Sequence, residues 1–197
     1  DGVHATNPSI AMDSRGFAHI CFYENIGSDL WYMTNIGGTW TTWKYTTGLA
    51  GAYPSIALDV NDKAHICFQV NPDHDIWYAT NAGGSWTTEL IDSAGNCGYY
   101  GSIALDTQGT AHVSYYDATN MDLRYANNVN GDWAAVTVTG GSGDVGQYTS
   151  IAVDSNDKVH ISFYDQTNGR VSYANNTDGN FHTTSGSVCP QPSPCTR

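Results

Sequence analysis

The sequence predicts an all-β fold, a β-propeller built from four four-stranded antiparallel blades. One unit recurs four times along the 197 residues, and apolar residues within each unit alternate with a period of two. No 11-residue stretch shows the 3.6-residue period of an amphipathic helix. Three closures stay open: a compact four-bladed ring, which we favour, two chains that form one larger ring as a homo-oligomer, and a piece of a longer propeller.

The repeat is anchored on a serine. The four serines, 46, 47 and 48 residues apart, are Ser9, Ser55, Ser102 and Ser150. Each is followed by an aspartate after 4 residues, a histidine after 10, a tyrosine after 23, an asparagine after 26 and a large aromatic residue after 31. All insertions fall between that aromatic residue and the next serine, so the unit is constant over 32 residues.

The second copy shows which strands each unit supplies. "SIALD" is a strand with Ile56 and Leu58 on one face, and the turn residues "VNDK" end it. "AHICF" and "DIWYAT" follow as the second and third strands, and the turn "NAGGS" precedes the fourth strand, "WTTELI". The predicted propeller domain covers 1–188 with blades at about 9–45, 55–92, 102–139 and 150–188, followed by a Cys- and Pro-rich tail at 189–197.

The turn between the third and fourth strands carries a recurring motif. "ATNAGGSW" (79–86) has Asn at its third place, Gly at its fifth and Trp at its eighth, and "MTNIGGTW" (33–40) fits equally. "ANNVNGDW" and "ANNTDGNF" lack the fifth-place glycine. The motif resembles the Asp-box, S-x-D-x-G-x-x-W, of bacterial neuraminidase-type repeats, and the architecture is similar to that of such propellers and of propeller lectins. The resemblance implies a propeller scaffold and no particular activity.

Composition narrows the partners and the location. The chain has 19 acidic and 7 basic residues, and its net charge of −12 repels phosphate backbones, so we expect no nucleic-acid partner. No run of about 18 apolar residues is present to span a membrane. No leader is visible at Asp1, so any signal peptide has been removed or lies outside this chain. The polar, lysine-poor composition is typical of an extracellular protein, either secreted or at the cell surface.

The five cysteines fall into two groups. Cys21 and Cys67 share one repeat position, where the other copies carry serine, which indicates small buried side chains. The three outside the repeat are disulfide candidates typical of an oxidising compartment. They are Cys97 in a predicted connecting loop, Cys189 and Cys195. Cys189 could pair with Cys195, or Cys97 with either.

Every copy places an aspartate and a histidine six residues apart. The aspartates are Asp13, Asp59, Asp106 and Asp154, and the histidines are His19, His65, His112 and His160. Four histidines around an axis could bind a metal or act as general bases. A catalytic group is needed once per site, however, whereas a structural brace is needed once per blade. Their presence in every copy therefore favours a structural role.

Motifs for metals and catalysis are missing. The turns "DVNDK" and "DSNDK" imitate the start of an EF-hand loop, but Ala64 and Val159 occupy the place of its required glycine. We therefore expect no metal and no cofactor. A sialidase needs three clustered arginines, whereas the four arginines here occupy unrelated repeat positions. No hydrolase or phosphate-loop motif appears either, so the sequence predicts that the protein is not an enzyme.

The connections that vary in length are the expected location of function, because loops on a rigid scaffold usually carry it. Tyr53, Tyr100 and Tyr148 each stand two residues before a repeat serine, and Asn7 stands there in the first copy. We expect the tyrosines to surround the mouth of the central channel, where aromatic faces with polar tips suit sugars or protein loops. The alternative is that each tyrosine only packs on the next blade.

The loops between second and third strands supply further ligand-binding candidates. These are Tyr23, Tyr116 and Tyr164, each followed by an acidic residue, Glu24, Asp117 or Asp165. Gln69 and Val70 break this pattern in the second copy. A tyrosine beside a carboxylate could bind sugar hydroxyl groups. Equally, the tyrosines could alternate into the packing between blades.

Three functions remain in order of preference. The first is a binding module that recognises carbohydrate or a protein surface through the loop-rich face of the propeller. The second is a structural subunit of an extracellular assembly or filament. The third is a hydrolase-like propeller enzyme.

Overall fold

The computed structural model describes residues 4–45, 50–141 and 143–186. Sixteen strands form four antiparallel sheets of four strands each, and every sheet is continuous in sequence. This confirms the predicted all-β fold with four blades. Within the described ranges the single helical segment is a 3₁₀ turn, η1 (Ile36–Gly38), and no helix is long and apolar enough to cross a membrane.

Each blade is an up-and-down sheet whose strands run outward in order. Blade 1 contains β1 (Ala5–Met12), β2 (Ala18–Glu24), β3 (Asp29–Thr34) and β4 (Thr41–Tyr45). Blade 2 contains β5 (Ala50–Leu58), β6 (Ala64–Val70), β7 (Asp75–Thr80) and β8 (Thr87–Asp92). Blade 3 contains β9 (Cys97–Leu105), β10 (Ala111–Asp117), β11 (Asp122–Asn127) and β12 (Ala134–Thr139). Blade 4 contains β13 (Val145–Val153), β14 (Val159–Asp165), β15 (Arg170–Asn175) and β16 (His182–Ser185).

The first strand of every blade begins before its repeat serine. The segments before the serines, which the sequence predicted to be connecting loops, are therefore largely part of these strands. The alternation does not reveal this, because each first strand carries a β-bulge just before the serine. In blade 2, Ala52 pairs with Gln69 and Ser55 with Cys67, which leaves two residues of β5 opposite one of β6. A bulge inserts an extra residue and breaks the period of two.

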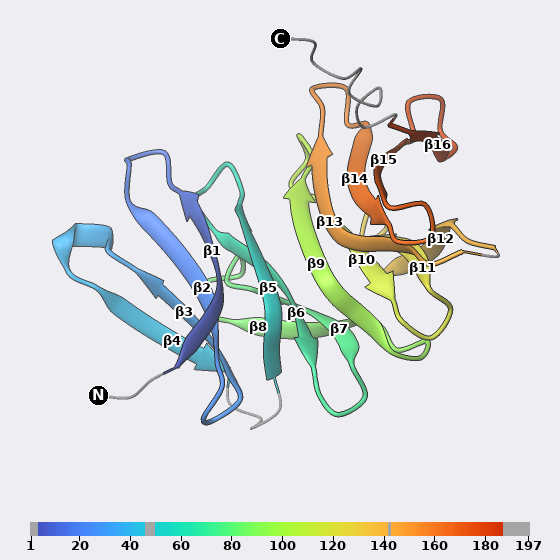
Figure 1. The fold of residues 1–197 in the computed structure, drawn as a ribbon. Helices are drawn as coiled ribbons and strands as arrows, with labels where there is room; N and C mark the ends of the chain where they lie inside the picture. Colours follow the sequence, from blue (N-terminus) through green and yellow to red (C-terminus); the bar gives the residue numbers. More distant parts are fainter. Residues whose placement is uncertain (1–3, 46–49, 142, 187–197) are drawn as a thin grey trace, which may run out of the picture.

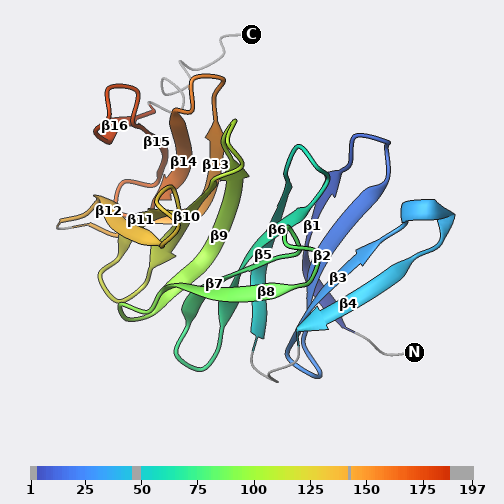
Figure 2. The same ribbon diagram turned by 180° about the vertical axis from the view of Figure 1, so that it is seen from behind.

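The four blades form an open arc, as both views show (Figure 1 and Figure 2). The first strands β1, β5, β9 and β13 lie side by side along its middle, and each contacts the next. Blades 1 and 4 stand at the two ends, with their fourth strands β4 and β16 at the outer edges (Figure 1). The compact four-bladed ring, which the sequence led us to favour, is therefore not formed by the described residues.

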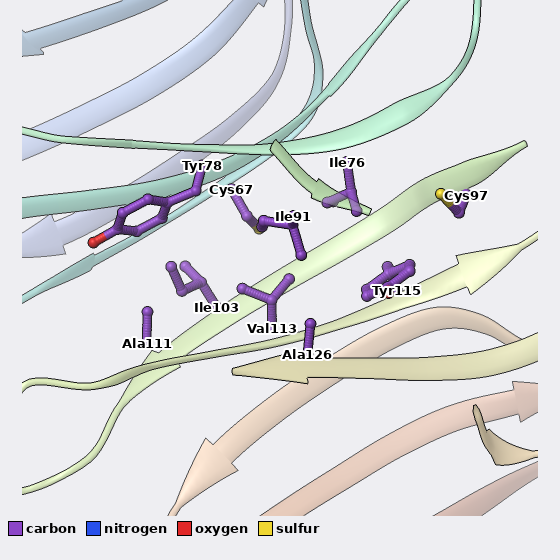
Figure 3. Close-up of a cluster of buried hydrophobic side chains, with 10 residues drawn as sticks. All are labelled: Cys67, Ile76, Tyr78, Ile91, Cys97, Ile103, Ala111, Val113, Tyr115 and Ala126. Carbon is purple, nitrogen blue, oxygen red and sulfur yellow. The ribbon is translucent and has the colours of Figure 1, made fainter. Parts of the chain in front are cut away.

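A hydrophobic core fills each of the three seams between consecutive blades. Figure 3 shows the cluster between blades 2 and 3, where Cys67, Ile76 and Tyr78 of blade 2 meet Ile103 and Val113 of blade 3. All five side chains are buried. Burial of apolar surface between blades is thus the main stabilising contribution, and each blade depends on its neighbours for it.

The aspartate and histidine of each copy lie within their own blade. In blade 3, Asp106 Oδ1 accepts hydrogen bonds from the turn N–H groups of Gln108 and Thr110, at 2.9 and 2.8 Å. His112 Nδ1 lies 2.5 Å from Tyr125 Oη, and its Nε2 lies 3.2 Å from Asp106 Oδ2. The same arrangement recurs in blades 1, 2 and 4, with longer Nε2–Oδ2 distances of 3.9, 3.7 and 3.4 Å. The contacts fit a brace that joins three strands of one blade.

Two other repeat positions join each blade to the next. A serine Oγ accepts a hydrogen bond from an isoleucine N–H at 3.2–3.3 Å in the pairs Ser9–Ile56, Ser55–Ile103 and Ser102–Ile151. A tyrosine packs against an aromatic ring of the next blade, with centroids 4.9–5.1 Å apart, in the pairs Tyr32–Trp86, Tyr78–Trp133 and Tyr125–Phe181. The three seams therefore repeat one pattern of contacts.

The turns after the first strands make a third contact, which occurs only at alternate seams. Ser14 of blade 1 donates hydrogen bonds from its N–H and Oγ to the carboxylate of Asp62 in blade 2, both at 2.8 Å. Thr107 of blade 3 does the same to Asp157 of blade 4, both at 2.9 Å. Between blades 2 and 3 the corresponding residues are valine and glycine, which offer no such pair.

Three of the five cysteines lie in the described residues. Cys21, Cys67 and Cys97 are buried free thiols in the described part of the chain. Cys97 begins strand β9 and does not lie in a connecting loop, and its Sγ is 3.3 Å from the carbonyl oxygen of Asp92. Cys189 and Cys195 lie outside the described residues, as does the tail 189–197.

The buried histidines make stability depend on pH. Burial lowers the pKa of His19 and His65 below the ordinary 6.5, so both are neutral in the fold while the unfolded chain binds a proton near pH 6.5. Their stabilisation is present above that pH and is lost as pH falls. We expect the free energy of unfolding, measured in urea, to decrease between about pH 7 and 5. His65→Gln should flatten that slope; an unchanged slope would contradict this account.

Candidate functional site

Three tyrosines of consecutive first strands form a continuous row, which we call the tyrosine row. Tyr53 of β5, Tyr100 of β9 and Tyr148 of β13 are its members. The ring centroids of Tyr53 and Tyr100 are 5.1 Å apart, and those of Tyr100 and Tyr148 are 4.3 Å apart. The structure thus brings together the three tyrosines that stand two residues before a repeat serine, and Tyr53 and Tyr100 each pack on the tyrosine of the next blade.

Each member of the row has an unusual backbone conformation. Their φ angles are +49°, +55° and +53°, and Asn7 at the same position of blade 1 has φ +52°. All four are the first residue of the β-bulge, a place where glycine is ordinarily favoured. A bulky side chain in this left-handed region costs about 1–3 kcal/mol, and such strain concentrates at functional sites. Strain at three adjacent tyrosines therefore marks the row as a functional candidate.

The row borders a shallow hollow of about 330 Å³. Its lining consists of the bulge residues of all four blades: Asn7, Pro8, Tyr53, Pro54, Tyr100, Gly101, Tyr148 and Thr149. Thr149 Oγ1 donates a hydrogen bond to the carbonyl oxygen of Tyr100 at 2.9 Å, which joins two neighbouring bulges. Tyr148 is 62% exposed, so an aromatic face is open to solvent.

Further aromatic rings flank the row. Tyr116 and Tyr164, two of the loop candidates, lie with their centroids 6.3 Å from Tyr100 and 6.4 Å from Tyr148, respectively. Tyr99 and His74 were not anticipated; Tyr99 lies 5.8 Å from Tyr53, and His74 lies 5.3 Å from Tyr99. The repeat offered no signal for them, because the other copies carry no aromatic residue at the position of Tyr99.

Tyr23, the remaining loop candidate, belongs to strand β2 of blade 1 and lies outside the row. Its hydroxyl donates to Ser28 Oγ at 3.2 Å, within the turn of its own blade. Asn7 stands at the blade 1 position of the row and supplies no ring. The aromatic surface therefore extends over blades 2, 3 and 4.

The hydroxyls of Tyr53, Tyr100 and Tyr116 stay protonated near neutral pH. Burial raises the pKa of Tyr53 and of Tyr100, and neighbouring tyrosines add to the rise. Burial and the hydrogen bond that Tyr116 Oη donates to Asp144 Oδ1, at 2.9 Å, raise the pKa of Tyr116 to about 12. Neutral phenols can donate and accept hydrogen bonds, which suits recognition of hydroxyl groups.

The three acidic candidates point into their own turns. Glu24 accepts hydrogen bonds from the N–H groups of Ile26 and Gly27, at 2.6 and 2.8 Å. Asp117 and Asp165 accept from residues two or three positions further along their turns, and all three carboxylates are buried. Their hydrogen bonds hold the loops between the second and third strands of blades 1, 3 and 4.

The arginines of the described residues lie in three different blades, each paired with aspartate. Arg15 Nη2 is 2.9 Å from Asp13, and Arg170 Nε is 3.0 Å from Asp165. Arg124 Nη2 is 3.0 Å from Asp92 Oδ2, which also accepts a hydrogen bond from buried Tyr115 at 2.5 Å. No group of three or more metal-binding side chains forms in the part of the chain that the structure describes.

No family model and no curated protein matches the chain. Solved structures do match in fold. An α-L-arabinanase of Penicillium chrysogenum in complex with arabinobiose has a TM-score of 0.66 and 12% identity, covering 92% of this chain and 66% of its own. The PL25 ulvan lyase bound to -[GlcA(1-4)Rha3S]-, an anionic glycan, has a TM-score of 0.65 and 15% identity, covering 92% of this chain and 55% of its own. The Aleuria aurantia lectin, as a point mutant in complex with Fucα1-6GlcNAc, has a TM-score of 0.64 and 16% identity, covering 95% of this chain and 63% of its own.

These matches confirm the propeller architecture, and the chain spans 55–66% of the length of the three proteins. They also correct one prediction. The sequence argued against an enzyme, yet two of these three structures are an arabinanase and a lyase, so enzymes occur with this fold and the prediction does not stand. The Asp-box resemblance is not confirmed, because no family model matches.

Proposed function

We propose that the tyrosine row is a binding site for uncharged oligosaccharides. The observation that carries this proposal is the contact of three strained tyrosines around an open hollow. Tyrosine rings offer a flat apolar surface for the C–H face of a sugar, and their hydroxyls can bond its hydroxyl groups. Rings fixed by backbone and neighbours lose little freedom on binding, which favours affinity.

The charge of the protein selects among sugars. A net charge of −12 disfavours sulfated and uronic-acid glycans, because their anionic groups are repelled at moderate ionic strength. Proteins of this fold include a lectin in complex with Fucα1-6GlcNAc and an arabinanase in complex with arabinobiose, which supports sugars as ligands. The extracellular location expected from composition is part of this proposal, since such glycans are abundant outside cells.

The test is a glycan array followed by titration calorimetry with the strongest neutral oligosaccharide. We expect Tyr100→Gly to weaken binding at least about tenfold, since about 1.4 kcal/mol of stacking is lost. Glycine suits φ +55°, so relief of strain offsets the lost packing and the fold is retained. Tyr23→Ala, outside the row, is the matched control and should bind as the parent does.

Two results would overturn the proposal: binding of anionic glycans only, or unchanged affinity of Tyr100→Gly. Chromatography of the sugar after the titration distinguishes reversible binding from cleavage. Intact sugar identifies a binding site, and shorter products identify an enzyme that uses the same row to hold its substrate.

A further inference from the structure

The two end faces of the arc expose apolar residues that the same positions bury elsewhere. On blade 1, Ile10 is 61% exposed and Trp40 is 48% exposed, whereas the equivalent isoleucines of the other blades are buried. On blade 4, Val171 is 52% exposed and Tyr173 is 37% exposed, whereas the equivalent residues of blades 1 to 3 are buried. We call these surfaces the blade 1 face and the blade 4 face.

The internal seams show what such faces bind. At each internal seam, the faces of two neighbouring blades pack together. The preceding blade contributes the equivalent of the blade 4 face, and the following blade contributes the equivalent of the blade 1 face. At the internal seams a serine Oγ accepts a hydrogen bond from the N–H of an isoleucine in the following blade. Ser150 is the equivalent of these serines, and Ile10 is the equivalent of these isoleucines. Tyr173 and Trp40 correspond to the tyrosine and the aromatic ring that pack together across each seam.

We infer that the blade 4 face binds the blade 1 face of a second copy of this chain, so that two chains close one eight-bladed ring. The partner is a second copy because the chain carries both halves of the seam, with each group of one face matched by a group of the other. Such a head-to-tail interface is heterologous, and it is stable as a closed assembly when the rotation between subunits completes a ring.

The turn residues identify which internal seam the new one resembles. Blade 4 carries Ser155 at the position of the donors Ser14 and Thr107, and blade 1 carries Gly16 at the position of the acceptors. The new seam therefore lacks the carboxylate that Asp62 and Asp157 supply at two seams. This matches the seam between blades 2 and 3, where glycine also occupies the position. The two-chain ring would therefore alternate the two kinds of seam without interruption.

One position departs from the internal seams. Gly51 and Gly146 approach the third strand of the preceding blade so closely that a Cβ there would lie 2.7 and 2.6 Å from backbone atoms of Leu30 and Leu123. Blade 1 has Ala5 at the same position. The seam between copies must therefore be wider at this end by the space of one methyl group.

Light scattering after size-exclusion chromatography tests the inference. The parent should have twice the single-chain mass of 21.2 kDa at micromolar concentration. Ile10→Asp and Val171→Asp, each on one face, should both run at the single-chain mass. Their folding is preserved because both side chains are largely exposed, and circular dichroism with thermal melting confirms it. Val129→Asp, equally exposed in the turn between β11 and β12, is the control and should keep the double mass.

Mixing the two variants separates a head-to-tail seam from a symmetric one. Each retains one intact face, and the two intact faces are complementary, so an equimolar mixture should recover a species of double mass. A parent that stays at single-chain mass would overturn the inference. So would a double mass that neither variant changes, or a mixture that fails to associate.

Discussion

His112→Ala is expected to lower the free energy of unfolding by about 3 kcal/mol, because it leaves the buried Tyr125 hydroxyl without its partner and opens a cavity. His112 is almost fully buried and contacts Tyr125 and Asp106 through its two ring nitrogens. Its loss removes the side-chain contacts that link the second strand of blade 3 to the third strand and to the first turn. Chemical denaturation with fluorescence detection measures the effect.

His160→Ala is the matched control. His160 makes the same contacts with Tyr173 and Asp154, at 2.5 and 3.4 Å, but its side chain is 30% exposed at the end of the arc. Water can replace its hydrogen bonds there, so the expected loss is smaller, about 1 kcal/mol. If the two variants lose the same free energy of unfolding, the contribution of this histidine to stability does not depend on its burial.

Gly146→Ala is expected to destabilise the protein by about 3 kcal/mol or more, through two separate causes. The residue has φ +105°, where an L side chain is strained. A Cβ at this position would also lie 2.6 Å from Leu123 Cα and 2.7 Å from its N, so blades 3 and 4 would have to separate. Denaturant unfolding gives the total, and a lower melting temperature should accompany it.

Gly109→Ala isolates the backbone contribution. Gly109 has φ +80°, and no atom lies within 4 Å of a Cβ built there. Only the strain of the left-handed conformation remains, and we expect a loss of about 1 kcal/mol. If Gly146→Ala lowers the free energy of unfolding no more than Gly109→Ala does, then the close contact between Gly146 and Leu123 does not contribute to the destabilisation.

The strand order could be predicted from the sequence because the copies confirm one another. Ile56 and Leu58 alternate in a segment that recurs with the same period at Ile103 and Leu105, and turn residues separate the segments at constant spacing. The histidines followed from the same comparison. A position occupied in all four blades, as His19 and His65 are, serves the framework, and the contacts with tyrosine and aspartate fit that reading.

The open arc could not be predicted, because a repeat describes only the contact between neighbours. Ile10 and Ile56 stand in the same sequence context, yet one is exposed and the other is buried by the blade before it. The bulge was hidden for a similar reason. A left-handed backbone is recognised in sequence by glycine, and Tyr53 and Tyr100 occupy that conformation without it.

The hydrogen bonds of the acidic loop residues could not be predicted from their neighbours in sequence. Glu24 and Asp117 follow tyrosines and therefore suggested a shared ligand site. Consecutive strand residues point to opposite faces, however, and turn N–H groups lie two and three residues further on. These N–H groups donate hydrogen bonds to the carboxylate oxygens of Glu24 and Asp117.

The alternating turns suggest how the gene grew. Blades 1 and 3 carry glycine at the left-handed position of the first turn, and blades 2 and 4 carry Asp62 and Asp157. Ser14 and Thr107 bond to those aspartates. Blade 4 also has a serine, Ser155, at the position of these donors, so it is the glycine and aspartate position that alternates. Duplication of single blades would not by itself produce this order. Duplication of an ancestral pair of blades would produce it directly, with the carboxylate and its donor inherited together as one unit.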